Sequence, residues 1–281
     1  MIPSIENALL LGHIPYYVKD GKSLLQSKEV VDLLAYLKLL INPYDTAAFE
    51  RATQTPKRGF GSESVRKLVR DSRLGQVDLV NASRREPKLN LFVSLLDLLR
   101  NVATVQPQQV SALIDLWMEK LEYTLEIDKA AKDPEDKNRR LENIRRFSGL
   151  AQEVMTTSAF DNLGDLLDHI TLMQEAGAAD ASDDRVHIMT AHSAKGLEYQ
   201  VVFAPCFFEG AIPHTRSMKK PDELAEEARL VYVIVTRAIR QLRISRPYMY
   251  ASRGATTQVA VHPSRFFEPM RHLFNVPGNK L

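Results

Sequence analysis

The sequence lacks the features typical of disulfide-rich, secreted and membrane-spanning proteins. It holds one cysteine, Cys206, among 281 residues, which excludes a disulfide framework and favours a reducing, cytoplasmic compartment. From its opening residues we expect no secretory signal peptide, and the sequence has no apolar run of about 18 residues that would span a membrane. Neither charge sign predominates, because 37 Lys and Arg face 35 Asp and Glu. The composition, 44% hydrophobic and 26% charged, is typical of a globular protein and provides enough apolar residues for a core.

A complete phosphate-binding loop is also missing. Gly21-Lys22-Ser23 matches the end of the G-x-x-x-x-G-K-[ST] motif, but the first glycine of that motif falls at Tyr16. Without that glycine the loop cannot wrap its backbone amides around a phosphate. We therefore interpret Lys22 and Ser23 as ordinary turn residues. This chain alone is not expected to hold a nucleoside triphosphate in the usual cradle.

The periodicity of apolar residues divides the chain into three parts. In the first, residues 14–18 predict a strand and residues 27–41 a helix that ends at Asn42-Pro43. In the second, residues 44–183, the spacing is helical throughout, and the part ends in a small polar linker, GAADASDD. Its predicted helices are 46–53, 62–71, 88–102, 107–123, 135–155 and 161–176. The third part returns to strand-like runs at 186–190, 200–204 and 242–245, with a helix over 223–240. This order predicts one α/β domain interrupted by a helical insertion, whose two ends lie close together.

Residues 190–198, TAHSAKGLE, form a polar bend between two strand-like runs. Their side chains offer hydrogen-bond donors suited to phosphate oxygens, and a carboxylate that could accept from a ribose hydroxyl. The donors are Thr190, His192, Ser193 and Lys195, and the carboxylate is Glu198. The alternative is a polar strand-to-helix loop whose side chains are only solvated. The residues alone leave both interpretations open.

Arg237 lies at the end of an apolar run inside the predicted helix 223–240. Burying a guanidinium is costly unless an anion or a carboxylate meets it. One interpretation is a structural salt bridge, for which Glu226 and Glu227 are the candidates. The other is an arginine finger, which stabilises the transition state of phosphoryl transfer.

The stretch TPKRGFGS, residues 55–62, places Gly59 and Gly61 on either side of one apolar residue at the start of a helix. Exposed backbone amides in such a turn suit a DNA phosphate, with Arg58 beside them. The alternative is a turn between two helices in which Ser62 is the N-cap.

Taken together, these stretches resemble the UvrD/Rep/PcrA family of superfamily 1 DNA helicases. TAHSAKGLEY is similar to the family's motif V and EEARLVYVIVTRA to its motif VI, and the resemblance covers nearly the whole chain in order. It implies a RecA-like, P-loop NTPase type of parallel-sheet domain interrupted by an all-helical insertion. The second RecA-like motor domain (2A) would comprise residues 1–41 and 184–281, and the insertion (2B) residues 42–183.

The resemblance also implies roles for the candidate residues. Arg237 would be the arginine finger that reaches the γ-phosphate of ATP, and Glu198 and Gly196 would contact the nucleotide. Thr190, His192, Ser193 and Lys195 would lie along the track of single-stranded DNA. The turn with Arg58, Gly59 and Gly61 would approach the duplex at a single-strand/double-strand junction. The family uses ATP and Mg²⁺ and moves 3′ to 5′; no metal ligand is predicted in this chain.

The chain also departs from the family pattern. It has no Walker A or Walker B motif, and its start, Met1-Ile2-Pro3-Ser4, corresponds to a point just inside the second motor domain. We therefore expect ATP and Mg²⁺ to be held mainly by a first RecA-like domain, supplied in cis or in trans, and the chain alone to be inactive. The alternative is a truncated helicase paralogue that acts as a non-enzymatic DNA- or protein-binding module. The residues do not indicate the pathway served, of which DNA repair is one candidate.

Overall fold

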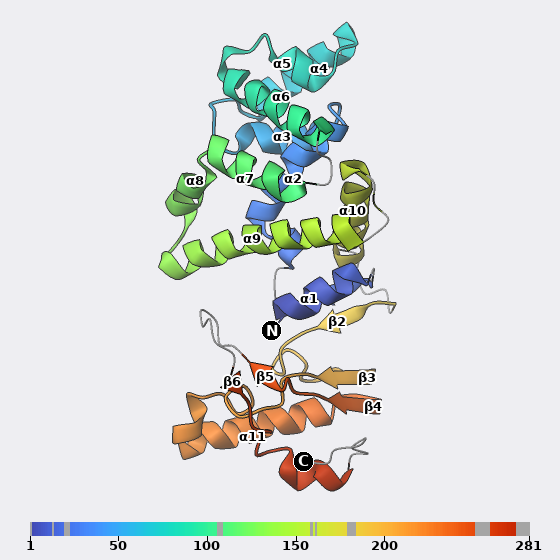
Figure 1. Ribbon diagram of the computed structural model, residues 1–281, viewed down its shortest axis with the longest axis vertical. Helices are drawn as coiled ribbons and strands as arrows, with labels where there is room; N and C mark the ends of the chain where they lie inside the picture. The colour runs from blue at the N-terminus through green and yellow to red at the C-terminus, as the bar shows by residue number, and fades with distance from the viewer. Residues whose placement is uncertain are drawn as a thin grey trace. The chain divides into compact units, whose positions relative to one another are not determined.

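The computed structural model describes residues 2–12, 14–19, 23–105, 109–157, 160, 162–178, 184–250 and 259–273. They form two compact units, residues 1–188 and residues 189–281. Each unit has its own hydrophobic core. Figure 1 labels the main elements of both units along the chain.

The first unit is mostly helical, and helix α2 lies at its centre. Most residues of α2 are buried, because the helix contacts α3, α6, α9 and α10. The elements of the unit are α1 (Ile2–Leu11), β1 (Tyr16–Val18), η1 (Leu24–Gln26), α2 (Lys28–Ile41), α3 (Thr46–Gln54), α4 (Ser62–Gly75), α5 (Leu79–Ser83), η2 (Pro87–Leu89), α6 (Asn90–Val105), α7 (Val110–Lys120), α8 (Tyr123–Ala130), α9 (Pro134–Thr157), α10 (Leu163–Ala178) and β2 (Val186–Ile188).

An aromatic cluster joins α2, α3, α6 and α7 of the first unit. Tyr36 packs edge-on against Phe92 and Trp117, with ring centroids 5.7 Å apart in both pairs, and Phe49 contacts Phe92 at 5.8 Å. All four side chains are fully buried. Such pairs add about 0.5–1.5 kcal/mol each beyond the burial of their area. The helical spacing of apolar residues in the sequence is explained by burial in the larger core to which these side chains belong.

Strands β1 and β2 pair in parallel, with Tyr16 opposite Val186 and Val18 opposite Ile188. Hydrogen bonds from Val186 N to Pro15 O and from Lys19 N to Ile188 O, both 2.9 Å long, extend the pairing at each end. The chain that leaves β1 therefore returns beside it after passing through the helices.

The second unit is built on a β-α-β arrangement. Its elements are β3 (Tyr199–Ala204), η3 (Ser217–Lys219), α11 (Pro221–Val235), β4 (Ala238–Ile244), β5 (Met249–Tyr250), β6 (Val259–Ala260) and η4 (Glu268–Leu273). Strands β3 and β4 pair in parallel, and parallel neighbours need a crossover, which here includes α11. Ala204, Phe207 and Val231 form the centre of the small core of this unit.

The structure confirms the mixed α/β class that the sequence predicts. The described strands form three two-stranded sheets, two parallel and one antiparallel. Helices lie within or across all the ranges that were expected to be helical, and Asn42 follows the last residue of α2 as expected. The proposed linker lies largely outside the described residues, as do Gly21 and Lys22. Ser23 is described: it caps η1, and its Oγ accepts from Leu25 N at 3.3 Å.

Two helix predictions are wrong in extent. The predicted helix 107–123 ends at Lys120 in its described part, because Glu122 has a φ of +48° that a continuing helix does not allow. The predicted helix 223–240 ends at Val235, and β4 begins three residues later. There the backbone of Arg237 joins the sheet instead, since its carbonyl accepts a 2.9 Å hydrogen bond from Tyr199 N.

The two compact units do not coincide with the two predicted domains, because the first unit contains both residues 1–41 and the predicted insertion. Residues 1–41 share a core with the helices that follow them, so contacts alone place them in the first unit. The predicted division, with 1–41 and 184–281 in one domain and 42–183 inserted, follows the resemblance and stays a prediction.

Candidate functional site

The polar bend 190–198 follows β2 and leads directly into β3. Its first turn is closed by hydrogen bonds from Ala194 N to Thr190 O, 3.1 Å, and from Ser193 N to the Thr190 hydroxyl, 3.2 Å. The hydroxyls of Thr190 and Ser193 lie 3.0 Å apart. These two side chains therefore hold each other and shape the turn, which the sequence prediction did not foresee.

The end of the bend turns at Gly196, whose φ is +85°. An L side chain rarely adopts this conformation, so glycine is favoured here by the backbone itself. Next to it, Leu197 N donates to Ala194 O at 3.1 Å. The Leu197 carbonyl accepts a hydrogen bond from a side-chain group outside the bend.

That group is the guanidinium of Arg237, which lies between the end of α11 and the start of β4. Its Nη1 donates to Leu197 O at 2.9 Å, Nε to Val233 O at 3.0 Å and Nη2 to the Thr236 hydroxyl at 2.8 Å. The structure thus brings Arg237 and the polar bend together, although 40 residues separate Arg237 from Leu197.

The salt bridge proposed for Arg237 is wrong. Glu226 pairs with Arg229, and Glu227 accepts a 2.9 Å hydrogen bond from the Ser217 hydroxyl. Among the described residues no carboxylate pairs with Arg237. Its acceptors are neutral, so they orient the guanidinium without cancelling its charge.

Three side chains of the bend point to solvent. His192, Lys195 and Glu198 are exposed, and their side chains have no hydrogen-bond or ion-pair partner in the described part of the chain. They are therefore available to a ligand. In the unit 189–281 the structure places together exposed bend residues of both charge signs, a glycine turn and a partly buried arginine.

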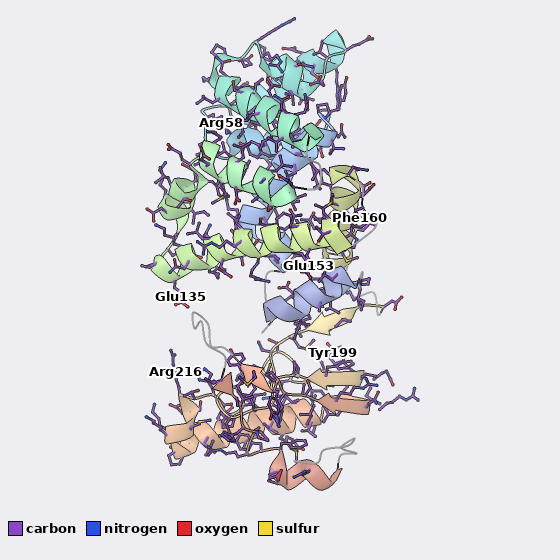
Figure 2. The ribbon with its side chains drawn as sticks, in the orientation of Figure 1. Arg58, Glu135, Glu153, Phe160, Tyr199 and Arg216 are labelled. Atoms are coloured by element: carbon purple, nitrogen blue, oxygen red, sulfur yellow. The ribbon has the colours of Figure 1, made fainter. Side chains whose placement is uncertain are left out.

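The turn at residues 55–62 lies in the first unit and differs from its prediction. Arg58, labelled in Figure 2, binds inward: its Nη1 donates to Ala52 O at 2.9 Å and its Nη2 to the Tyr36 hydroxyl at 2.7 Å. Its guanidinium also lies 5.5 Å from the ring centre of Phe92. The side chain of Arg58 therefore holds the end of α3, and the expectation that this side chain faces DNA is not supported by its contacts.

The backbone of the same turn is shaped by its two glycines. Gly59 has a φ of +66°, and its carbonyl accepts a 3.1 Å hydrogen bond from Lys88 Nζ. Gly61, not Ser62, is the N-cap of α4, and no side chain caps that helix end. The first amides of α4 thus have no side-chain cap, and the predicted backbone contact to a DNA phosphate stays a prediction.

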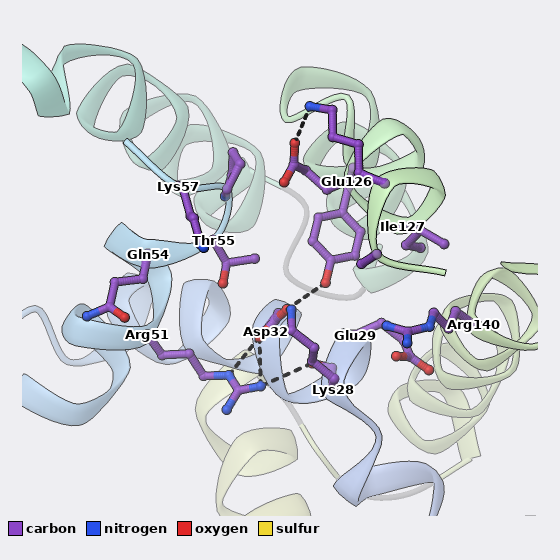
Figure 3. Close-up of a pocket in the computed structure, with 14 residues that line it drawn as sticks. Lys28, Glu29, Asp32, Arg51, Gln54, Thr55, Lys57, Glu126, Ile127 and Arg140 are labelled. Carbon is purple, nitrogen blue, oxygen red and sulfur yellow. Dashed lines mark hydrogen bonds and ion pairs between the residues drawn. The ribbon is translucent and has the colours of Figure 1, made fainter. Parts of the chain in front are cut away.

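The first unit also has a polar groove of about 650 Å³, which sequence analysis missed. Figure 3 shows it between α2, α3, α8 and α9, with Asp32 at its base. The Asp32 carboxylate, 1% exposed, accepts hydrogen bonds from Lys28 Nζ at 2.5 Å, Arg51 Nε at 2.8 Å and Tyr123 Oη at 2.6 Å. Burial, with the nearby Asp32 charge, raises the pKa of Tyr123 above its ordinary value, so its hydroxyl stays a donor.

In the described residues, no group of three or more His, Cys, Asp or Glu side chains could hold a metal ion. No helix in the same residues is both long and apolar enough to cross a membrane. Sequence analysis missed two features: Thr236 in the second unit and, separately, the groove cluster around Asp32 in the first unit. Arg51 and Tyr123 reach Asp32 only in the folded chain. The direction of the Arg237 side chain, on which the role of Thr236 depends, is likewise set by the fold.

The family model described as UvrD-like helicase C-terminal domain matches residues 1–247. The ATP-dependent DNA helicase PcrA of Leuconostoc citreum is 31% identical over 94% of this chain and 37% of its own length. PcrA of Bacillus subtilis is 32% identical over 90% and 36%, and DNA helicase II of Escherichia coli is 32% identical over 93% and 38%. The chain therefore spans little more than a third of the length of these relatives.

Proposed function

The chain belongs to the UvrD-like helicase C-terminal domain family, and from this premise we propose that it is the C-terminal motor portion of an ATP-dependent 3′–5′ DNA helicase. In this proposal residues 1–41 and 184–281 belong to the second RecA-like motor domain, and residues 42–183 form its helical insertion. The parallel pairs β1–β2 and β3–β4 support this fold, since parallel strands joined through helices build α/β motor domains. The cytoplasm is the proposed compartment.

The observation that carries the proposal is the unbalanced charge of Arg237. Three of its N–H groups bind neutral acceptors, one on each guanidinium nitrogen. Because each terminal nitrogen bears a second hydrogen, one N–H on Nη1 and one on Nη2 have no partner among the described residues. A guanidinium that is held in place, partly buried and not neutralised is suited to the charge that develops in phosphoryl transfer.

The other candidate residues take the remaining roles in this proposal. Gly196 and Glu198 contact the nucleotide. The exposed His192 and Lys195 contact the phosphates of single-stranded DNA, and Thr190 and Ser193 shape the bend that presents them. In the first unit, the backbone amides at Gly59 and Gly61 contact duplex DNA at the junction, whereas Arg58 supports that turn from within.

We further propose that the chain alone does not hydrolyse ATP. ATP and Mg²⁺ are held mainly by a first RecA-like domain, in cis or in trans, whose P-loop this sequence lacks. A phosphoryl-transfer rate needs the phosphates, the metal ion and the attacking water positioned together. Arg237 contributes charge to the transition state only when that site is complete.

The test is ATPase activity of the purified chain with single-stranded DNA, measured alone and after mixing with a first motor domain from the same source. We expect activity only on mixing, and a loss of roughly 10³- to 10⁵-fold in Arg237→Ala. Arg229→Ala is the matched control, because Arg229 lies on α11 and pairs with Glu226. It should keep the activity.

The outcomes separate the alternatives. Hydrolysis by the chain alone would contradict its proposed inactivity, and activity that survives Arg237→Ala would contradict the finger role. No activity in either arm, with salt-dependent DNA binding retained, would favour a non-enzymatic binding module.

A further inference from the structure

The hydroxyl of Thr236 is fixed in direction by the last turn of α11. Its Oγ lies 2.9 Å from Tyr232 O and 3.1 Å from Val233 O, and its single hydrogen is donated to these carbonyls. Arg237 Nη2 lies 2.8 Å from the same Oγ, and a guanidinium nitrogen can only donate. The Thr236 oxygen is therefore an acceptor aimed at Arg237.

The guanidinium of Arg237 is thereby held at three points. Two of them, Val233 O and the Thr236 hydroxyl, lie at the end of α11, and the third, Leu197 O, lies on the polar bend. The main chain adds a fourth link, since Tyr199 N donates to Arg237 O at 2.9 Å. The end of α11 and the exit of the bend form one hydrogen-bonded assembly.

We infer that Thr236 is the positioning residue of Arg237, and that through Arg237 it ties the polar bend to the end of α11. The inference rests on the proposed function for its consequence in ATP hydrolysis, but the positioning itself is a property of this chain. An arginine side chain has several rotatable bonds, and ordering it costs conformational entropy. An acceptor of fixed direction for Nη2 selects one arrangement, which also keeps Nη1 on the Leu197 carbonyl.

Two substitutions at one position isolate the hydroxyl. Thr236→Val keeps the shape of the side chain and removes the acceptor, whereas Thr236→Ser keeps the acceptor. Ser217→Ala is the matched control, because it removes a hydroxyl that bonds Glu227 in the same unit, away from Arg237. If Thr236→Val does not fold, Thr236→Ala replaces it with the same expectations.

The first measurement is amide hydrogen exchange of the purified chain at residues 194–199. We expect exchange several-fold faster in Thr236→Val, and wild-type rates in Thr236→Ser and Ser217→Ala. Amides of the first unit should not change in any variant, which separates a local loosening from general destabilisation. Equal exchange at the bend in Thr236→Val and wild type would overturn the inference.

The second measurement is the steady-state kinetics of the chain mixed with the first motor domain. Loss of one hydrogen bond to a charged group should lower kcat about tenfold in Thr236→Val, with the KM for ATP little changed and with rescue in Thr236→Ser. If the mixture is active, loses its activity in Arg237→Ala and keeps its kcat in Thr236→Val, the inference is overturned and the proposed function is left intact. An inactive wild-type mixture with a loosened bend in Thr236→Val would count against the proposed function and support the positioning.

Discussion

The hydroxyl of Tyr123 donates a 2.6 Å hydrogen bond to the carboxylate of Asp32, 91 residues earlier in the chain. Asp32 also accepts from Lys28 and Arg51, so one buried carboxylate gathers three donors from α2, α3 and α8. A buried charge is tolerated only where such partners surround it. This contact fastens α8 to the central helix at the base of the groove.

Tyr123→Phe should destabilise the first unit without changing its fold. The substitution removes one donor from a buried carboxylate, which costs about 1–3 kcal/mol of unfolding free energy. Urea denaturation followed by circular dichroism measures the change. Tyr44→Phe is the control, because Tyr44 is 61% exposed and its hydroxyl has no partner in the described residues. Equal urea midpoints for Tyr123→Phe and wild type would show that the contact adds no stability.

Gly59 and Gly61 should respond differently to substitution. Gly59→Ala places a Cβ at a φ of +66° and should destabilise the turn by about 1–2 kcal/mol. Gly61→Ser should keep or slightly raise stability, because α4 has no side-chain cap and serine is a preferred N-cap. Thermal unfolding measures the stability of the two variants, and Gly59→Ala should have the lower melting temperature.

The Gly61→Ser variant also separates folding from DNA binding. If the amides at the start of α4 contact a DNA phosphate, the added side chain should weaken binding to a single-strand/double-strand junction while the protein stays stable. Unchanged junction affinity in a folded Gly61→Ser chain would remove Gly61 from the proposed DNA contacts.

Much of the fold could be predicted because it rests on local patterns. Apolar residues at helical spacing gave the helices, and Asn42-Pro43 gave the end of α2. The end of α11 could not be predicted, since the apolar residues Ala238 and Ile239 continue the pattern past Val235, whereas in the fold they belong to β4, which pairs with β3. The inward direction of the Arg58 side chain could not be predicted either, because its partner Tyr36 lies 22 residues away and contacts it only in the folded core.

For the candidate site, the sequence predicted the residues that lie in motifs but not the partners that they contact in the folded chain. Motif-like stretches identified the bend and Arg237, which contact each other in the structure. The partners of Arg237 were mistaken, because opposite charges nearby on the helix suggested a salt bridge, whereas the folded chain offers it carbonyl oxygens. The network around Asp32 was missed because only Lys28 lies at helical spacing from Asp32, whereas Arg51 on α3 and Tyr123 on α8 reach it only in the folded chain.

Lys195 should contribute one phosphate contact to the binding of single-stranded DNA. Its side chain is exposed and has no partner among the described residues. Lys195→Gln should therefore weaken binding and reduce the slope of log Kd against log salt by about 0.7. Fluorescence anisotropy over a salt series measures both. Lys220→Gln is the control, because Lys220 pairs with Glu223 at 2.7 Å; a slope change equal in the two variants would indicate a general charge effect only.

The attachment of residues 262–267 to the second unit should depend on acid pH. The Arg265 side chain and backbone amide bond to Glu209 and hold the pKa of this carboxyl below its ordinary value of 4.5. Because the folded pKa is lowered, the stabilising contribution is complete above pH 4.5 and is lost as pH falls through the folded pKa. The Arg265 amide should therefore lose its protection from hydrogen exchange as the pH falls below 4.5, after correction for the intrinsic exchange rate.

Glu209→Gln should remove this acid transition, since the glutamine side chain carries no titratable charge. The variant should show reduced protection of the Arg265 amide at neutral pH and no further loss on acidification. Glu268→Gln is the matched control, because Glu268 is exposed and pairs with Arg271 one turn away. If Glu209→Gln keeps the wild-type acid transition, another carboxyl must hold residues 262–267, and the pairing of Glu209 with Arg265 does not govern their attachment.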